Sequence, residues 1–317
     1  MGHQTAENRR DSCPRTNMCC DLAVDALRYA RRVKHAVFVA KKKGRVQYIK
    51  AKDVAFTAYD RRFPYELDTE KHRDRWGNMP RMYFLHRDPP EGTRTTLTAP
   101  RHVYLFWTGS NPLTPARELG VSSIRSHNPD LDVVVVTPDN LPDFVVEGHP
   151  LHPAYENLSL NHRSDYLRAY FMHHHGGGYS DVKQTDHCWR AGLERLNSTP
   201  ELWLIGYPEV SSSSCGGRDA RLGPDIRRHF ASLIGCATYF VRPGTPFTAE
   251  WLRELDRRLD YYADEIAITP GSTWGDNQGY PIAWIELGSD VFHPLQLKYL
   301  RHIAQDAALL PHLDDHR

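Results

Sequence analysis

The sequence lacks the features that would place it in a membrane or outside the cell. No apolar run approaches the roughly 20 residues that a membrane-spanning helix requires. The N-terminal residues are polar and include no apolar stretch of the signal-peptide type. The six cysteines are scattered over 317 residues, unlike the dense spacing of a small disulfide-bonded domain. We therefore expect a cytoplasmic protein with reduced thiols.

Several common motifs are also missing. The chain has no Walker A sequence, no GxGxxG and no GxSxG, which excludes the usual P-loop, dinucleotide-binding and α/β-hydrolase signatures. It has no CxxC pair, and its HxxxH pair, His312 and His316, falls in the last residues, where fraying is expected. His173–His175 cannot share one ion well, because neighbouring helix residues point about 100° apart. We predict no metal-binding residues.

Positive charge collects in the first third of the chain. Residues 1–100 hold 21 Lys and Arg against 12 Asp and Glu, a net of +9, whereas residues 101–317 hold 19 against 27, a net of −8. Such a basic region could contact a membrane surface peripherally, or it could be a solvated face. It lacks the interleaved aromatics of an RNA-binding face, so no nucleic-acid partner is expected.

The order of the expected elements predicts two parts. Residues 1–95 form a basic α+β extension, with a helix over 21–43 that ends at Gly44 and strand-like pieces at 46–49 and 82–85. Residues 96–317 form the main domain, in which strands and helices alternate. The strands are expected at 102–107, 132–137, 179–182, 203–207 and 236–241, and the helices at 114–127, 159–175 and 245–264. Such alternation predicts an α/β fold with a mainly parallel sheet, whose ligands bind beyond the carboxyl ends of the strands.

The most informative segment is residues 162–185, HRSDYLRAYFMHHHGGGYSDVKQT. Asp165 and Arg168 are three residues apart and share one helix face. The glycines at 176–178 permit a sharp turn, and Asp181 follows at the end of a strand. Carboxylates accept hydrogen bonds from sugar hydroxyls, and a guanidinium can bind hydroxyls or phosphate. From spacing alone, a surface ion pair, a helix cap and a turn residue explain the same pattern.

This segment resembles the DXD-type glycosyltransferases of the GT-A fold. The pattern S-D-x-x-R followed by G-G-x-Y-x-D is similar to that of the capsular polysaccharide synthesis proteins, and more distantly to the yeast-type initiating mannosyltransferases and the large glucosylating toxins. YLFWTG at 104–109 and HNPD at 127–130 resemble the opening units of that family. The likeness covers about residues 101–188. It implies a GT-A-like, Rossmann-type nucleotide-sugar-binding domain.

The resemblance also implies roles for individual residues. Asp165 would bind donor-sugar hydroxyls, Arg168 the sugar or its diphosphate, and Asp181 the ribose and the sugar. Trp107 would flank the base. The full set of implied donor-binding residues is Trp107, Thr108, Gly109, Asp165, Arg168, Gly177, Tyr179 and Asp181.

One position departs from the family pattern. Where the second aspartate of DXD normally ligates Mn²⁺ or Mg²⁺, this chain has Lys183. A charged lysine cannot ligate a cation, but it can place positive charge beside a departing diphosphate. We therefore predict a transferase that requires no metal, with Asp181 and Lys183 as catalytic residues. Two alternatives stay open: Asp186, His187 or a later residue could rebuild a Mn²⁺ or Mg²⁺ site, or catalysis could be lost.

Residues 272–297 combine polar and aromatic residues on a Gly- and Pro-rich framework. Aromatic faces stack on sugars, and amides bind hydroxyls, so we predict acceptor binding by Trp274, Asn277, Tyr280 and His293. An inverting transferase needs a carboxylate base, for which Asp276, Glu286 and Asp290 are candidates. A loop that merely closes over the core would explain this composition equally well.

Together these features predict a glycosyltransferase that moves a sugar from a UDP- or GDP-sugar donor to a glycan acceptor. The resemblance suggests a role in capsular or cell-surface polysaccharide synthesis. One alternative is a toxin or effector that glycosylates a protein. Another is a catalytically silent module that binds nucleotide or glycan, a reading that Lys183 keeps open.

Overall fold

The computed structural model describes residues 15–68, 70–73, 82–217 and 221–314. The chain divides into two compact units, Met1–Lys52 and Asp53–Arg317. The described part of the first unit is helical and belongs to α1 (Arg15–Arg62). None of the described helices combines the length and the hydropathy that crossing a bilayer requires.

Helix α1 corrects two expectations about the extension. It does not end at Gly44 but continues to Arg62 through the residues predicted as a strand at 46–49. An exposed glycine costs a helix only about 1 kcal/mol relative to alanine, so the flanking helix formers carry α1 past it. The second predicted strand, at 82–85, lies largely in the 3-10 helix η2 (Tyr83–His86). The described residues before 96 thus contain no strand, while the predicted boundary at 95–96 stays a prediction.

A six-stranded sheet organises the second unit, in the order β2-β1-β3-β5-β4-β6. β1 is parallel to β2 and β3, β4 is parallel to β6, and β5 is antiparallel to its neighbours β3 and β4. Five strands therefore share one direction. The strands are β1 (His102–Phe106), β2 (Asp132–Val136), β3 (Gly177–Ser180), β4 (Leu204–Pro208), β5 (Ile234–Val241) and β6 (Ile303–Gln305).

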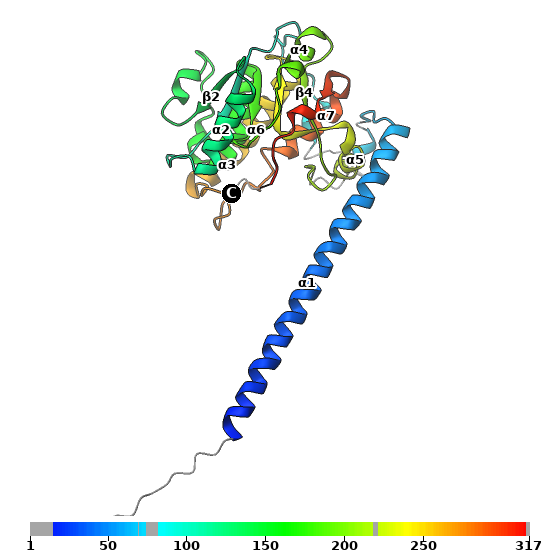
Figure 1. The fold of residues 1–317 in the computed structure, drawn as a ribbon. Coiled ribbons are helices and arrows are strands. Elements are labelled where there is room, and N and C mark those ends of the chain that lie inside the picture. The colour runs from blue at the N-terminus through cyan, green and yellow to red at the C-terminus, as the bar shows by residue number, and fades with distance from the viewer. Residues whose placement is uncertain (1–14, 69, 74–81, 218–220, 315–317) are drawn as a thin grey trace, which may run out of the picture. The chain divides into compact units, whose positions relative to one another are not determined.

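Helices cover both faces of this sheet (Figure 1). Along β1, Tyr104 and Phe106 join one hydrophobic cluster, and Val103 and Leu105 join the other. The first cluster includes residues of α3 (Leu160–His174), α6 (Pro246–Ile268) and α7 (Ser289–Lys298). The second includes residues of α2 (Pro115–His127) and α4 (Arg190–Ser198). This arrangement is the predicted α/β fold with a mainly parallel sheet.

The expected strands and helices of this unit are confirmed to within a few residues, but three α-helices and one strand of the described residues were not predicted. These are α4, α5 (Leu222–Arg228), α7 and β6. Helix α7 contains Pro294, and proline usually indicates the end of a helix. Its surroundings override that preference, because Asp290 through Leu297 are all buried.

The three glycines before Tyr179 are required by packing. Gly177 has a φ of 87°, and a Cβ there would lie 2.7 Å from the carbonyl oxygen of His102. A Cβ on Gly178 would lie 2.6 Å from the ring of Phe240. Strand β3 is therefore inserted closely between β1 and β5. Gly177, predicted to bind the donor, lies at the start of β3, whereas Asp181 follows its end.

Candidate functional site

Helix α3 holds the first part of the site. The Ser159 hydroxyl caps the helix by accepting the backbone N–H of His162. One turn further on, Asp165 and Arg168 form an ion pair, with only 4% and 14% of their side chains exposed. Arg168 also donates to the carbonyl oxygen of Cys236 at 3.3 Å, which connects α3 to the beginning of β5. The two predicted residues therefore form a buried pair, not a surface pair.

A chain of contacts leads from this pair to the end of β3. The Arg168 guanidinium lies over the Tyr179 ring, 5.0 Å from its centroid. The Tyr179 hydroxyl donates to Oδ1 of Asp181 at 2.6 Å. The other oxygen, Oδ2, accepts an ion pair from Nζ of Lys183 at 2.8 Å. The structure thus brings together five of the residues predicted at the donor and catalytic positions.

The charged groups of this site shift one another's pKa values. Burial would raise the pKa of Asp181, but Lys183 and Arg168 outweigh burial and hold that pKa below its usual value. Burial would likewise lower the pKa of Arg168, yet Asp165 raises it. Burial raises the pKa of Asp165, against the opposing charge of Arg168. At neutral pH the strand end therefore presents an ionised Asp181 that is already paired with a cation.

The residues at this strand end do not fit the metal that DXD-type sites commonly hold. The position of the second aspartate carries an ammonium group, which has no lone pair for a metal. Asp186, the nearby alternative ligand, binds Nε2 of His312 at 2.7 Å instead. His312 also donates its backbone N–H to the carbonyl oxygen of Gln184, so this residue is held in place, contrary to the expected fraying. Lys183 is the cation that the chain itself places beside Asp181.

The loop after β1 reaches the beginning of α3. The Thr108 hydroxyl donates to the carbonyl oxygen of Leu160 at 2.7 Å. A Cβ on Gly109 would lie 3.1 Å from Cδ1 of the same leucine, so the loop passes close to the helix. The Trp107 indole donates to the carbonyl oxygen of Asn111 at 2.6 Å, which fixes the ring within the loop. The predicted base-binding segment therefore lies against the helix that carries Asp165.

The predicted acceptor segment lies on the same helix. Nδ1 of His162 and the Tyr280 hydroxyl are 2.9 Å apart, and their rings stack with centroids 5.6 Å apart. Nε2 of His162 lies 3.3 Å from the carbonyl oxygen of Trp284. Asn277 binds within the loop, accepting from the backbone N–H of Ser272 and donating to the carbonyl of Pro270. Trp274 and Trp284 are 59% and 54% exposed and can stack on a ligand.

The three carboxylates predicted as candidate bases differ in their exposure and in their hydrogen-bond partners. Glu286 accepts hydrogen bonds from the Tyr262 hydroxyl at 2.8 Å and from the backbone N–H of Ala283 at 3.2 Å. Asp290 is buried and accepts the backbone N–H of Gly217 at 2.7 Å. Asp276 is exposed and accepts only the Ser272 hydroxyl in the described structure. Of the three carboxylates, Asp276 is the one open to an acceptor hydroxyl.

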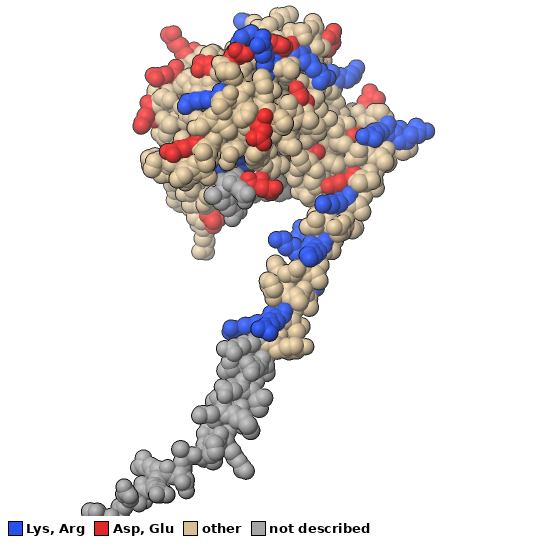
Figure 2. Space-filling model, viewed as in Figure 1, with Lys and Arg blue, Asp and Glu red and all other residues tan. Residues whose placement is uncertain are grey.

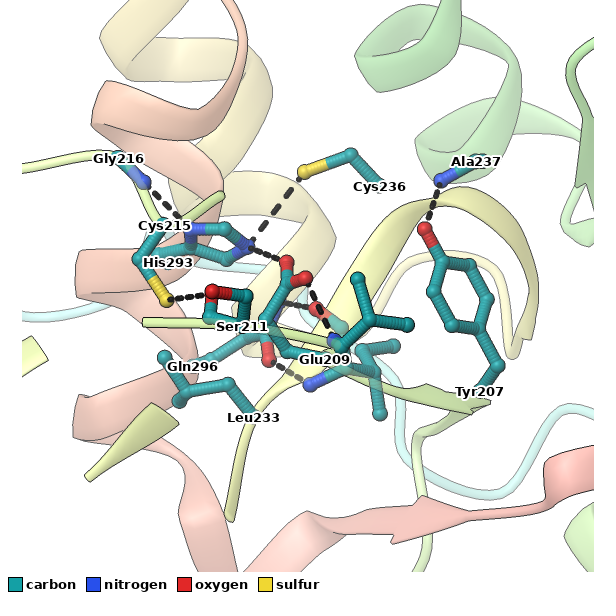
Figure 3. Close-up of polar contacts among 12 residues, drawn as sticks. Tyr207, Glu209, Ser211, Cys215, Gly216, Leu233, Cys236, Ala237, His293 and Gln296 are labelled. Carbon is teal, nitrogen blue, oxygen red and sulfur yellow. Dashed lines mark hydrogen bonds and ion pairs between the residues drawn. The ribbon is translucent and has the colours of Figure 1, made fainter. Parts of the chain in front are cut away.

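His293, predicted at the acceptor site, is fully buried in a polar cluster that the sequence did not indicate (Figure 3). Its Nδ1 accepts the backbone N–H of Gly216 at 2.9 Å. A neutral imidazole has a single N–H, so the proton is on Nε2. Nε2 lies 3.6 Å from Oε2 of Glu209 and 3.5 Å from Sγ of Cys236. Burial lowers the pKa of His293 to about 4, so the ring is neutral.

Glu209 is the residue of this cluster that sequence reasoning missed. It directly follows β4, at the same carboxyl edge of the sheet as Asp181, and burial raises its pKa. Its position after a strand could have been noticed, but no motif surrounds it. Oxygen, sulfur and nitrogen atoms of Glu209, Cys215 and His293 lie within 4.8 Å of one another. Because Nδ1 accepts the Gly216 N–H, Nε2 carries the proton and has no free lone pair for a metal, so we assign no metal to this cluster.

Comparison with known proteins agrees with the geometry of the strand end. Residues 116–197 match a family model described as a glycosyltransferase sugar-binding region containing a DXD motif. The match confirms the predicted DXD-type glycosyltransferase region, which runs from α2 into α4. The search of curated proteins found no match. Among solved structures, the chain is similar to "PaToxG Glycosyltransferase", with 14% identity, a TM-score of 0.36, and coverage of 68% of this chain and 72% of that one.

Proposed function

We propose that this glycosyltransferase moves a sugar from a UDP- or GDP-sugar to a glycan acceptor. The observation that carries the proposal is the convergence of two ion pairs, Asp165–Arg168 and Asp181–Lys183, at the carboxyl end of β3. Carboxylates bind sugar and ribose hydroxyls, and the cations suit a diphosphate. The family match spans all four residues.

In the proposed reaction, the bond between the anomeric carbon and the diphosphate oxygen breaks, and an acceptor hydroxyl oxygen bonds to that carbon. The electron pair leaves with the diphosphate, whose developing charge Lys183 stabilises without a metal. The exposed Asp276 is available to take the hydroxyl proton. Trp274 and Tyr280 would position the acceptor beside the donor. The resemblance to capsular polysaccharide synthesis proteins favours a growing capsular or cell-surface glycan as the acceptor.

The test is release of free nucleotide from a panel of UDP-, GDP- and CMP-sugars, with EDTA and with Mn²⁺. We expect release from a UDP- or GDP-sugar that persists in EDTA and is lost in Asp181→Asn. That substitution retains the size of the side chain and an acceptor for the Tyr179 hydroxyl. Release that requires Mn²⁺ would contradict the role of Lys183. Tight nucleotide binding without turnover would show a silent binding module instead.

A second assay separates glycan acceptors from protein acceptors. Labelled donor is incubated with the enzyme and either cell-surface polysaccharide fragments or a mixture of proteins. Label in the polysaccharide supports the proposal, and it should fall in Trp274→Ala. Label in protein alone would favour the effector alternative.

A further inference from the structure

One side of helix α1 carries no charged residue over residues 29–52. Residues 31–52 hold nine Lys and Arg and no Asp or Glu. With consecutive residues about 100° apart around a helix, all nine cations lie outside one arc of about 120°. This uncharged arc runs along the helix for more than five turns. Its members include Tyr29, Val33, Val37, Ala40, Tyr48 and Ala51.

The arc exposes apolar surface. The exposed fractions are 70% for Tyr29, 48% for Val37 and 68% for Tyr48. Monomeric proteins seldom leave a long apolar stripe in water. Figure 2 shows Lys and Arg side chains along the described part of α1. Long cationic side chains next to such a stripe can lay their methylene groups on apolar surface and keep their charges in water.

The charge of α1 distinguishes between possible partners. A second copy of the helix would bring nine like charges against nine, at a cost in repulsion. A nucleic acid would pair with the cations and leave the apolar arc in water. An anionic bilayer surface accommodates both the cations and the apolar arc. Its headgroups attract Lys and Arg, and the boundary with the acyl chains takes up apolar and aromatic side chains.

We infer that α1 is an interfacial helix that binds the protein to an anionic phospholipid surface, with its uncharged arc facing the lipid. Tyr29 and Tyr48 would lie at the headgroup level, where amphipathic rings are favoured. The cations that flank the arc on either side, such as Lys41 and Lys43, would contact lipid phosphates. This inference concerns α1 alone and does not depend on the chemistry at Lys183.

The experiment is co-sedimentation of the full chain with vesicles of phosphatidylcholine, with and without phosphatidylserine. We expect binding to the anionic vesicles that weakens as NaCl is added. Val33→Gln with Val37→Gln makes the arc polar at unchanged charge, and should weaken binding by about tenfold or more. Their matched control is Val33→Leu with Val37→Leu, which should bind like the wild type. Circular dichroism checks that α1 stays helical.

A second set of variants tests the cations. Lys41→Gln, Lys42→Gln and Lys43→Gln together should weaken binding to anionic vesicles by at least about tenfold, and the matched triple arginine variant should not. Nucleotide release should be unchanged in all of these variants. Failure to bind anionic vesicles, or equal binding to pure phosphatidylcholine, would overturn the inference. A dimer in light scattering that dissociates in the Val→Gln variant, or nucleic-acid binding that survives in it, would identify a different partner.

Discussion

Nζ of Lys183 lies 2.8 Å from Oδ2 of Asp181, so the cation at this strand end is a covalent part of the chain. The side chain of Lys183 is 13% exposed and that of Asp181 is 29% exposed, which leaves the pair reachable by a ligand. A tethered ammonium needs no metal from solution to place positive charge beside a diphosphate. This relationship distinguishes the site from DXD sites with two aspartates.

Removing the charge of Lys183 should reduce turnover more than it reduces stability. We expect Lys183→Ala to lower the rate of nucleotide release by about 100-fold, because the leaving group loses its cation. Lys183→Arg keeps the charge and should retain most of the activity. Lys183→Asp restores the family pattern, and we expect its residual release to depend on Mn²⁺. Wild-type rates in Lys183→Ala would contradict the proposed role.

The ion pair on α3 should matter for folding as well as for binding. Asp165→Ala leaves the Arg168 guanidinium buried without its partner, and breaking a buried pair in this way costs about 3–5 kcal/mol. Asp165→Asn retains a hydrogen-bond acceptor and should cost less. Urea unfolding of both variants measures the difference. Equal stability of Asp165→Ala and the wild type would show that Arg168 finds another partner or becomes hydrated.

The absence of a side chain at Gly120 should be needed to keep the Lys183 backbone in place. A Cβ on Gly120 would lie 3.2 Å from the backbone nitrogen of Lys183 and 3.2 Å from the carbonyl group of Val182. Alanine gains about 1 kcal/mol of helix propensity, which offsets the crowding, so stability should change little. Displacing Lys183 by a few tenths of an ångström should lower nucleotide release by about tenfold.

Gly44→Ala is the matched control, because a Cβ at Gly44 would have no neighbour within 4 Å. It should stabilise α1 and leave nucleotide release unchanged. Equal release by Gly120→Ala and Gly44→Ala would contradict the positioning role of Gly120.

Burial of His293 should make stability depend on pH. Its pKa is about 4 in the folded protein and about 6.5 when unfolded, so the unfolded state binds the proton more tightly. The free energy of unfolding should therefore fall as pH drops from 6.5 towards 4, by up to about 3 kcal/mol from this residue. His293→Asn can still accept the Gly216 N–H and cannot protonate. Urea unfolding at several pH values should show a weaker acid dependence in the variant, and an equal dependence would contradict this account.

The periodic patterns were sufficient to predict the main elements. The valine run at 132–137 predicted β2, and the alternation after residue 101 predicted a mainly parallel sheet between helices. The extension was predicted less well, because Gly44 indicated a helix end and the following residues are β-branched and aromatic. On an exposed helix no neighbouring element packs against such residues, so continued backbone hydrogen bonding keeps them helical.

Within the site, the sequence itself determined the types of charge and their spacing. Asp165, Arg168, Asp181 and Lys183 were recognised from one short motif, because the first pair is three residues apart on a helix and the second pair follows directly after a strand. Only the tertiary structure decided which of them pair, how deeply they lie, and that Glu209 and His293 meet across β4 and α7. The reason is that a contact over 84 residues depends on how sheet and helices pack, and short-range periodicity does not contain that information.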